Sequence, residues 1–223
     1  MKTNSDLKND VQNALKWEPS LKTSKIGVAV DDGIVILTGT VEDYSQKSEA
    51  EDAAKNVAGV MAVVEEIEVK TITWGVTTDA EIAKEILRIF KWKFQVSNER
   101  VQIKVENGWV SLEGELAWNF QKEAVEAAVK HLTGVKGISN NIEIRSLTQD
   151  AVEEKDIQSA LERNWALNDH DVDVKAAGSK ITLTGTVSSL YQKEEAGKIA
   201  WKAPGVEKVV NDLVVDYDFA FND

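Results

Sequence analysis

Apolar residues along the chain change their spacing in a fixed order, and the chain repeats that order three times. Each repeat begins with apolar residues at i, i+4, i+7 and i+8, the stripe of a helix with one buried face, except that the third has Glu153 at the first of these positions. Two segments that alternate apolar and polar residues follow, as half-buried strands do. A second helical stripe, rich in small residues, and a last alternating segment complete the repeat. The pattern predicts the order helix, strand, strand, helix, strand.

The repeats can be superimposed residue by residue. The first helical stripe is carried by Leu7, Val11, Ala14 and Leu15, by Ile82, Ile86, Ile89 and Phe90, and by Ile157, Ala160 and Leu161. The second is carried by Ala50, Ala53, Ala54 and Val57, by Val125, Ala128, Val129 and Leu132, and by Ala196, Ile199, Ala200 and Ala203. The last strand is carried by Val63, Ile67 and Val69, by Ile138, Ile142 and Ile144, and by Val209, Leu213 and Val215.

Glycines fix the register of the repeats. The two strands of each hairpin are joined by "DDG", "ENG" or "AGS", in which glycine beside Asp or Asn favours the positive backbone dihedrals of a tight turn. A second set lies on the inward face of the second strand, where we expect a helix to cross closely; a third set, 20 positions later, is expected to end the second helix as left-handed caps. These two sets are Gly39, Gly114 and Gly185, and Gly59, Gly134 and Gly205.

The predicted fold class is α+β, with three tandem αββαβ units. The second strand, second helix and third strand of a unit form a crossover that should be right-handed, so these two strands are parallel within a mixed three-stranded sheet. Both helices cover one face of that sheet. We expect the units to span residues 1–72, 77–146 and 150–218.

Three segments carry a family resemblance: "DDGIVILTGTV", "ENGWVSLEGEL" and "AGSKITLTGTV", each followed by a helix and a Gly-Val pair. Two units close on "GVKGISNNIEI" and "GVEKVVNDLVV", with Asn140 and Asn211 at a shared position where the first unit has Glu65. The chain resembles the BON domain family. That resemblance implies a non-enzymatic protein tied to envelope integrity, osmotic stress and attachment to phospholipid, in many members periplasmic, and it transfers no catalytic residue.

Charge is distributed unevenly over the three units. The net charge of -12 divides into -5 for residues 1–76 (8 basic, 13 acidic), 0 for 77–148 (10 and 10) and -7 for 149–223 (8 and 15). Acidic units repel phosphate backbones and anionic lipid head groups. The neutral middle unit is therefore the one best suited to approach either.

The composition argues against an enzyme. The chain has no cysteine and two histidines, and it contains no P-loop, dinucleotide fingerprint, H-E-x-x-H or serine triad order. We expect no cofactor and no metal. The polar start and the lack of a long apolar run predict no transmembrane segment and a cytoplasmic location, or a periplasmic one if a leader has been removed.

Tryptophans divide into two groups when the repeats are compared. Trp17, Trp92 and Trp165 close the first helix of each unit, so we expect them to be apolar plugs over a small core, with ligand stacking as the alternative. Trp109 and Trp118 stand where the other units have Ile34 and Lys180, or Asp43 and Ser189, so the shared core does not require them. We expect both to be exposed, or buried against another unit.

The middle unit therefore holds the predicted contact surface for lipid or protein, because aromatic rings suit both membrane interfaces and protein hot spots. Packing between adjacent repeats is the alternative reading of the same residues. A further tryptophan in the linker, Trp74, is expected to wedge between the first and second units. The candidate surface consists of Lys91, Lys93, Phe94, Trp109, Trp118 and Phe120.

Two weaker motifs have simpler explanations. "NDHDVD" groups Asp169, His170, Asp171 and Asp173, which could hold a divalent ion, but alternation along a strand makes it a solvated edge. "GVKG" at 134–137 matches the G-x-x-G clamp of KH domains, yet the other units read "GVMA" and "GVEK".

The leading hypothesis is a non-catalytic adaptor that binds phospholipid surfaces or a protein partner under osmotic or envelope stress. A nucleic-acid binder that uses the middle unit is a less favoured alternative, and a purely structural spacer is another. The sequence does not fix the oligomeric state.

Overall fold

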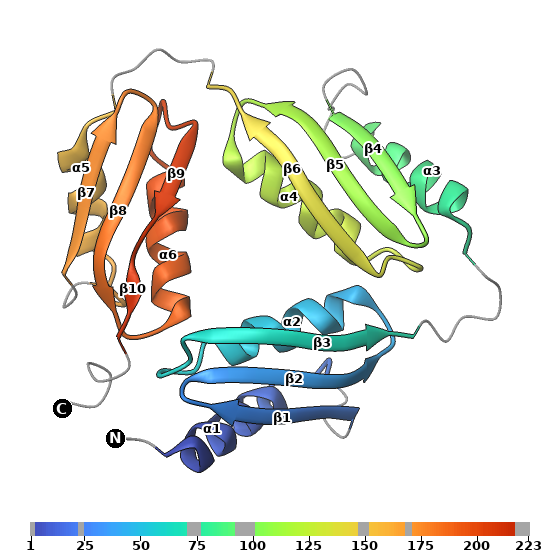
Figure 1. Ribbon diagram of the computed structural model, residues 1–223. Helices are drawn as coiled ribbons and strands as arrows, with labels where there is room; N and C mark the ends of the chain where they lie inside the picture. Colours follow the sequence, from blue (N-terminus) through green and yellow to red (C-terminus); the bar gives the residue numbers. More distant parts are fainter. Residues whose placement is uncertain are drawn as a thin grey trace. The chain divides into compact units, whose positions relative to one another are not determined.

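The computed structural model describes residues 3–21, 25–70, 77–91, 101–146, 152–167 and 171–216. Within them the predicted fold class is confirmed: six α-helices accompany three small sheets, and the predicted element order occurs in each repeat (Figure 1). Each unit is described by itself. The elements of the first are α1 (Asn4–Trp17), β1 (Ile26–Asp31), β2 (Ile34–Val41), α2 (Tyr44–Lys55) and β3 (Ala62–Val69).

The middle unit has the same order of elements. They are α3 (Asp79–Ile89), β4 (Val101–Glu106), β5 (Trp109–Leu116), α4 (Asn119–Lys130) and β6 (Gly137–Ile144). β4 pairs with β5 antiparallel, and β5 pairs with β6 parallel, as the crossover requires. The first unit has the matching strand order β1-β2-β3, in which β1 and β2 are antiparallel.

The third unit has one more strand than predicted. Its elements are α5 (Glu154–Glu162), β7 (Val172–Ala177), β8 (Lys180–Val187), α6 (Leu190–Trp201), β9 (Lys208–Asn211) and β10 (Val214–Val215). β9 and β10 both pair with β8 parallel, so they are two halves of the predicted last strand. The interruption falls where the Leu213 amide donates to the Asn211 side-chain oxygen and the Asp212 amide donates to the Leu183 carbonyl.

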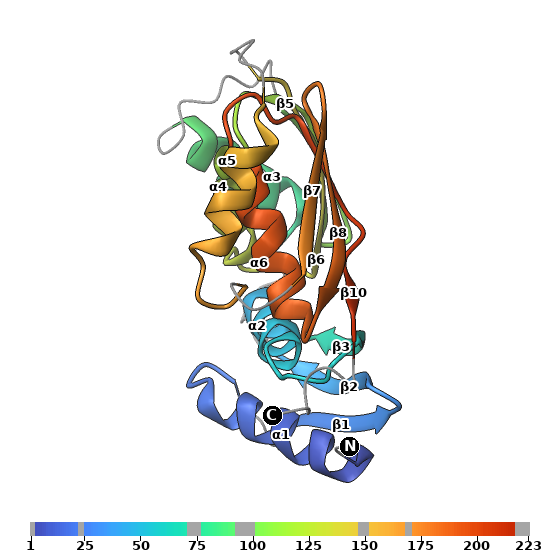
Figure 2. The same ribbon diagram turned by 90° about the vertical axis from the view of Figure 1, so that its left-hand side faces the viewer.

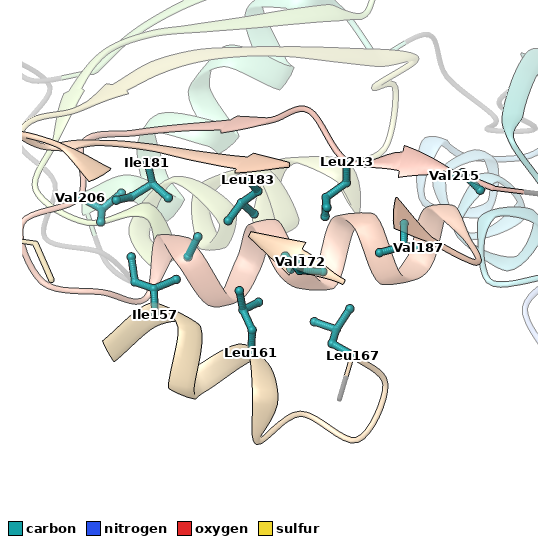
Figure 3. Packing of buried hydrophobic residues seen from close by; sticks show 12 residues of the cluster. Ile157, Leu161, Leu167, Val172, Ile181, Leu183, Val187, Val206, Leu213 and Val215 are labelled. Carbon is teal, nitrogen blue, oxygen red and sulfur yellow. The ribbon is translucent and has the colours of Figure 1, made fainter. Parts of the chain in front are cut away.

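Both helices of a unit lie on one face of its sheet, as Figure 2 shows for α5 and α6. In every unit the first helix packs on the first strand, and in the middle and third units the second helix packs on the last strand. Figure 3 shows the resulting core of the third unit, in which side chains of the strands point toward the two helices. The inward side chains of β8 are apolar: Ile181, Leu183 and Val187 are each 0% exposed. The other face of each sheet carries no helix of its own unit.

Glycine explains the turns as predicted. In the first two hairpins Asp32 and Gly33, and Asn107 and Gly108, have positive φ at both turn positions, which is the pattern of type I′ turns. The glycines beyond the second helices are also left-handed, with φ of +96°, +92° and +84°, each four residues past the last helical residue. These are Gly59, Gly134 and Gly205.

The reason given for Gly39 and Gly185 was wrong. A side chain at either position would overlap with the backbone of the residues that lead into the first strand of the same hairpin, not with a crossing helix. The obstructing carbonyl oxygens belong to Lys25 and Asp171. Both glycines also have φ above +120°, outside the left-handed well that other residues can reach. Backbone geometry at the hairpin edge is thus what requires glycine here.

Candidate functional site

Trp118 and Phe120 form a stacked aromatic pair at the beginning of α4. Their ring centroids lie 6.4 Å apart at an interplanar angle of 27°, a favourable offset arrangement. Trp118 is the residue before the helix, and its amide donates to the side-chain oxygen of Gln121 at 3.1 Å. Phe120 is 64% exposed, while Trp118 is half-buried. The pair therefore presents an apolar surface to solvent on a fixed helix end.

Lys91 lies at the same end of the unit as this pair. The carboxylate of Asp79, the first residue of α3, accepts hydrogen bonds from the amides of Asn107 and Gly108 at 2.8 and 2.9 Å. These bonds hold the beginning of α3 at the β4–β5 turn. Its other end, which runs on to the exposed Lys91, then lies toward the end of β5, from which the chain leads to Trp118.

Trp109 lies at the opposite end of the middle unit. It opens β5, and Trp118 follows that strand's last residue by two positions. At roughly 3.3 Å per residue the strand alone separates the two by about 23 Å. The candidate surface is therefore not one patch: Lys91 and the Trp118–Phe120 pair lie toward one end of the unit, and Trp109 lies at the other. Lys93, Phe94 and the linker residue Trp74 lie outside the described residues.

The Trp109 ring is held flat on the sheet. It is paired in register with Gly137, and a side chain at Gly137 would overlap with the ring. The indole nitrogen donates to the Ser139 hydroxyl at 3.0 Å, and 49% of the residue is exposed. Half of Trp109 thus covers a strand glycine, which gives it a structural role alongside any contact it makes.

The prediction that Trp17 and Trp165 plug the core was wrong. They are 84% and 83% exposed. The chain that follows each helix turns back and closes the core with a leucine instead: Leu21 is 8% exposed and Leu167 is 2% exposed. These two leucines occupy equivalent positions in the repeat, whereas the two tryptophans are offset by two residues, and that offset was the available signal. Trp92 lies outside the described residues.

A lysine and an asparagine link the second helix to the last strand, and sequence reasoning missed the lysine. In the middle unit Lys122 Nζ donates to the Ile142 carbonyl at 2.8 Å, Asn140 Nδ2 donates to the Lys122 carbonyl, and Asn140 Oδ1 accepts from the Ile142 amide. The third unit repeats all three bonds with Lys193, Asn211 and Leu213. We call this arrangement the lysine–asparagine clasp.

The clasp has a structural explanation and a sequence signal. Burial lowers the pKa of the Lys122 ammonium, and Glu126 and Glu143 oppose that shift. In the first unit Glu65 replaces the asparagine and still accepts from the Ile67 amide, at 2.6 Å. The signal was the Gln-Lys pair that recurs in "YSQK", "NFQK" and "LYQK".

The open sheet faces of the three units differ in chemistry. Equivalent outward positions hold Ile34 and Val64 in the first unit, each 41% exposed, but Ser139 and Val210 match Val64 in the others. The middle face carries Trp109 and ion pairs such as Lys104 with Glu106 at 3.0 Å. The third face carries lysines and threonines: Lys175, Lys180, Thr182, Thr184, Thr186 and Lys208.

Two weaker motifs do not become sites in the described part of the chain. Asp171 and Asp173 are exposed, Asp169 and His170 lie outside the described residues, and no group of three metal-ligating acidic or histidine side chains is found among the residues that are described. In "GVKG", a side chain at Gly134 would press on Thr77 and Ile82 of its own unit, and Gly137 lies under Trp109. Neither glycine is open to a nucleic-acid backbone.

Comparison with known proteins supports the architecture. The family model described as "BON domain" matches residues 3–71, 78–146 and 149–217, which is nearly the whole chain. The chain belongs to the BON domain family. It is 28% identical over 139 residues to Osmotically-inducible protein Y of Escherichia coli (strain K12), across 60% of this chain and 69% of that protein. None of the described helices is long and apolar enough to cross a membrane.

Two solved structures also resemble the BON chain. Both are of CdsD, described as a structural protein of the Type III secretion system of Chlamydia trachomatis, and both are 16% identical to it. One match covers 98% of this chain and 99% of the CdsD chain, with a TM-score of 0.26. The other, to the C-terminal domain of CdsD, covers 96% of this chain and 100% of that domain, with a TM-score of 0.25. These TM-scores are too low to support a functional argument.

Proposed function

We propose that this BON-domain protein is a non-catalytic adaptor of osmotic or envelope stress that attaches to phospholipid surfaces through the aromatic end of its middle unit. The stress role is supported by the similarity to an osmotically inducible protein and by the family. The observation that carries the attachment is the stacked Trp118–Phe120 pair with Phe120 64% exposed. Because the family is tied to the cell envelope, this role favours a location of the protein at the envelope over the cytoplasmic location that the polar start predicted.

The charge distribution favours this unit over the other two. Residues 77–148 carry no net charge, because 10 basic residues balance 10 acidic ones, whereas the flanking segments carry -5 and -7. An acidic surface is repelled by anionic head groups. The neutral unit can approach a membrane without that repulsion, and Lys91 stands at the end that approaches.

The expected affinity is low. Burying a phenylalanine side chain contributes roughly 1.5–3 kcal/mol, and one lysine near an anionic leaflet contributes about 1 kcal/mol. Together these give a dissociation constant in the millimolar range for one end. Attachment should therefore depend on lipid concentration and rise when anionic lipid is added to the vesicles.

Vesicle co-sedimentation tests the proposal with a matched pair of variants. We expect the double variant Trp118→Ala/Phe120→Ala to lose most binding to phosphatidylcholine and to mixed phosphatidylglycerol vesicles. Trp109→Ala, which also removes a half-exposed indole but at the other end of β5, should keep it. Both variants are first checked for an unchanged melting curve.

The proposal fails if the wild-type chain ignores both kinds of vesicle at millimolar lipid, or if Trp109→Ala loses binding while the double variant keeps it. In the first case capture of a protein partner by cross-linking becomes the relevant measurement. Binding to DNA or RNA that falls steeply with added salt would instead support the nucleic-acid alternative.

A further inference from the structure

Three lysines gather on the open face of the third unit's sheet. Lys180 on β8 is paired in register with Lys208 on β9, so the two side chains stand side by side. Lys175 on β7 is paired with Thr182, which places it diagonally across from Lys180. Neighbours of this kind are about 5 Å and 7–8 Å apart, within the reach of long side chains. All three lysines are exposed.

This arrangement is unfavourable for the folded unit alone, because like charges directly opposite on a sheet destabilise it. None of the three ammonium groups has an ion-pair or hydrogen-bond partner among the described residues. Two acidic residues lie near them: Asp173 is outward on β7, two positions before Lys175, and Glu207 accepts a hydrogen bond from the Ser179 hydroxyl at 3.0 Å.

The equivalent positions of the other units show that the fold does not require these lysines. Lys180 replaces Ile34 and Trp109, and Lys208 replaces Ala62 and Gly137. The middle unit does keep a lysine at the third position, Lys104, but there it pairs with Glu106 at 3.0 Å. In the third unit the residue equivalent to Glu106 is Ala177, so the equivalent ion pair cannot form. The charge is also locally unexpected, since residues 149–223 carry a net -7.

We propose that Lys175, Lys180 and Lys208 form a binding site for a phosphate-class oxyanion on the open face of the third unit. Three ammonium groups supply charge and hydrogen-bond donors, and the half-buried Thr182 hydroxyl, directly opposite Lys175, adds a neutral donor. The bound anion relieves the repulsion between Lys180 and Lys208. The site is independent of the aromatic end of the middle unit.

Isothermal titration of the full chain with inorganic tripolyphosphate at low salt tests the site. The triple variant Lys175→Gln/Lys180→Gln/Lys208→Gln should bind at least tenfold more weakly. The matched control, Lys155→Gln/Lys198→Gln/Lys202→Gln, removes the same charge from the helical side of the same unit and should change the affinity less than threefold. The single variant Lys180→Gln, which also relieves repulsion, serves if the triple variant does not fold.

A second arm identifies the source of the phosphate. Phosphatidylglycerol vesicles are offered to both triple variants in the Trp118→Ala/Phe120→Ala background, which removes attachment through the middle unit: binding lost only in the sheet-face triple, without tripolyphosphate binding, assigns the site to lipid head groups. Tripolyphosphate binding lost only in that variant assigns it to a soluble phosphate. Equal losses in the two triples, or no saturable binding to either probe, overturn the proposal. Trp118→Ala/Phe120→Ala should keep tripolyphosphate binding, so the two proposals fail separately.

Discussion

Replacing Gly185 by alanine tests the explanation for the glycine that recurs in the second strand of each unit. At Gly185 the backbone has φ of +121°, and a new Cβ would overlap with the Asp171 carbonyl oxygen while lying 3.0 Å from its carbonyl carbon and 3.3 Å from Val172 Cα. All these atoms are backbone, so no side-chain rotation relieves the overlap. The beginning of β7 has to move away from β8.

The cost has two parts. A non-glycine residue outside the allowed wells costs about 1–3 kcal/mol. Moving the Asp171 carbonyl also breaks the bond that it accepts from the Thr186 amide at 3.1 Å, worth roughly 0.5–1.5 kcal/mol. We therefore expect Gly185→Ala to lower the free energy of unfolding of the third unit by about 2–4 kcal/mol.

Gly178→Ala is the matched control. Gly178 has φ of +64°, inside the left-handed well, and a new Cβ there meets no atom within 4 Å. That strain, about 1–2 kcal/mol, is offset in part by the reduced freedom of the unfolded chain. Amide hydrogen exchange of β8, measured by mass spectrometry on the full chain, reports the opening free energy of the third unit for each variant. Equal losses for the two variants would refute the explanation by backbone overlap.

Four further outcomes are expected. The fragment 77–146 should unfold cooperatively in urea by itself, which checks the proposed unit boundary; a non-cooperative loss of circular dichroism would contradict it. Asn211→Ala should cost the third unit about 1–2 kcal/mol in the same exchange experiment, because it removes the two clasp bonds that the asparagine side chain makes. Trp17→Ala should change the unfolding free energy by less than about 0.5 kcal/mol, since the residue is 84% exposed; a loss above 2 kcal/mol would restore the plug. Hydrogen bonds from Thr78 lower the pKa of Glu81. The stability that this carboxylate adds to α3 is therefore present above its unfolded pKa and is lost as the pH falls through its folded pKa. Glu81→Gln should flatten this acid dependence, measured by hydrogen exchange of the α3 amides from pH 6 to 2.

The sequence predicted the elements because each has its own spacing, and three copies tested each assignment. The last strand of the third unit shows the limit: the spacing of Val209, Leu213 and Val215 was correct, but it did not predict that this strand is divided into β9 and β10. Spacing reports which residues are inward. It does not report where a strand is interrupted.

Comparison of the copies was informative for the candidate surface only in part. Because Lys180 and Asp43 stand at the equivalent positions, Trp109 and Trp118 were not assigned to the shared core, and Trp109 is indeed 49% exposed. Their placement at opposite ends of β5 became clear only from the structure, which gives the bounds of that strand. Periodicity alone did not predict the exposure of Trp17, because it does not rank Trp17 against Leu21, four residues later; the offset between Trp17 and Trp165 was the signal that did.

The sheet face opposite the helices of each unit leaves room for evolutionary specialisation. Inward residues are constrained by the core, whereas outward residues on the same strands can change freely, and in this chain they have become aliphatic, aromatic with paired charges, and cationic. Tethering such surfaces on one polypeptide raises the local concentration of each for a composite target, so contacts too weak to act alone gain strength from linkage. One repeated scaffold thus carries three outward faces of different chemistry.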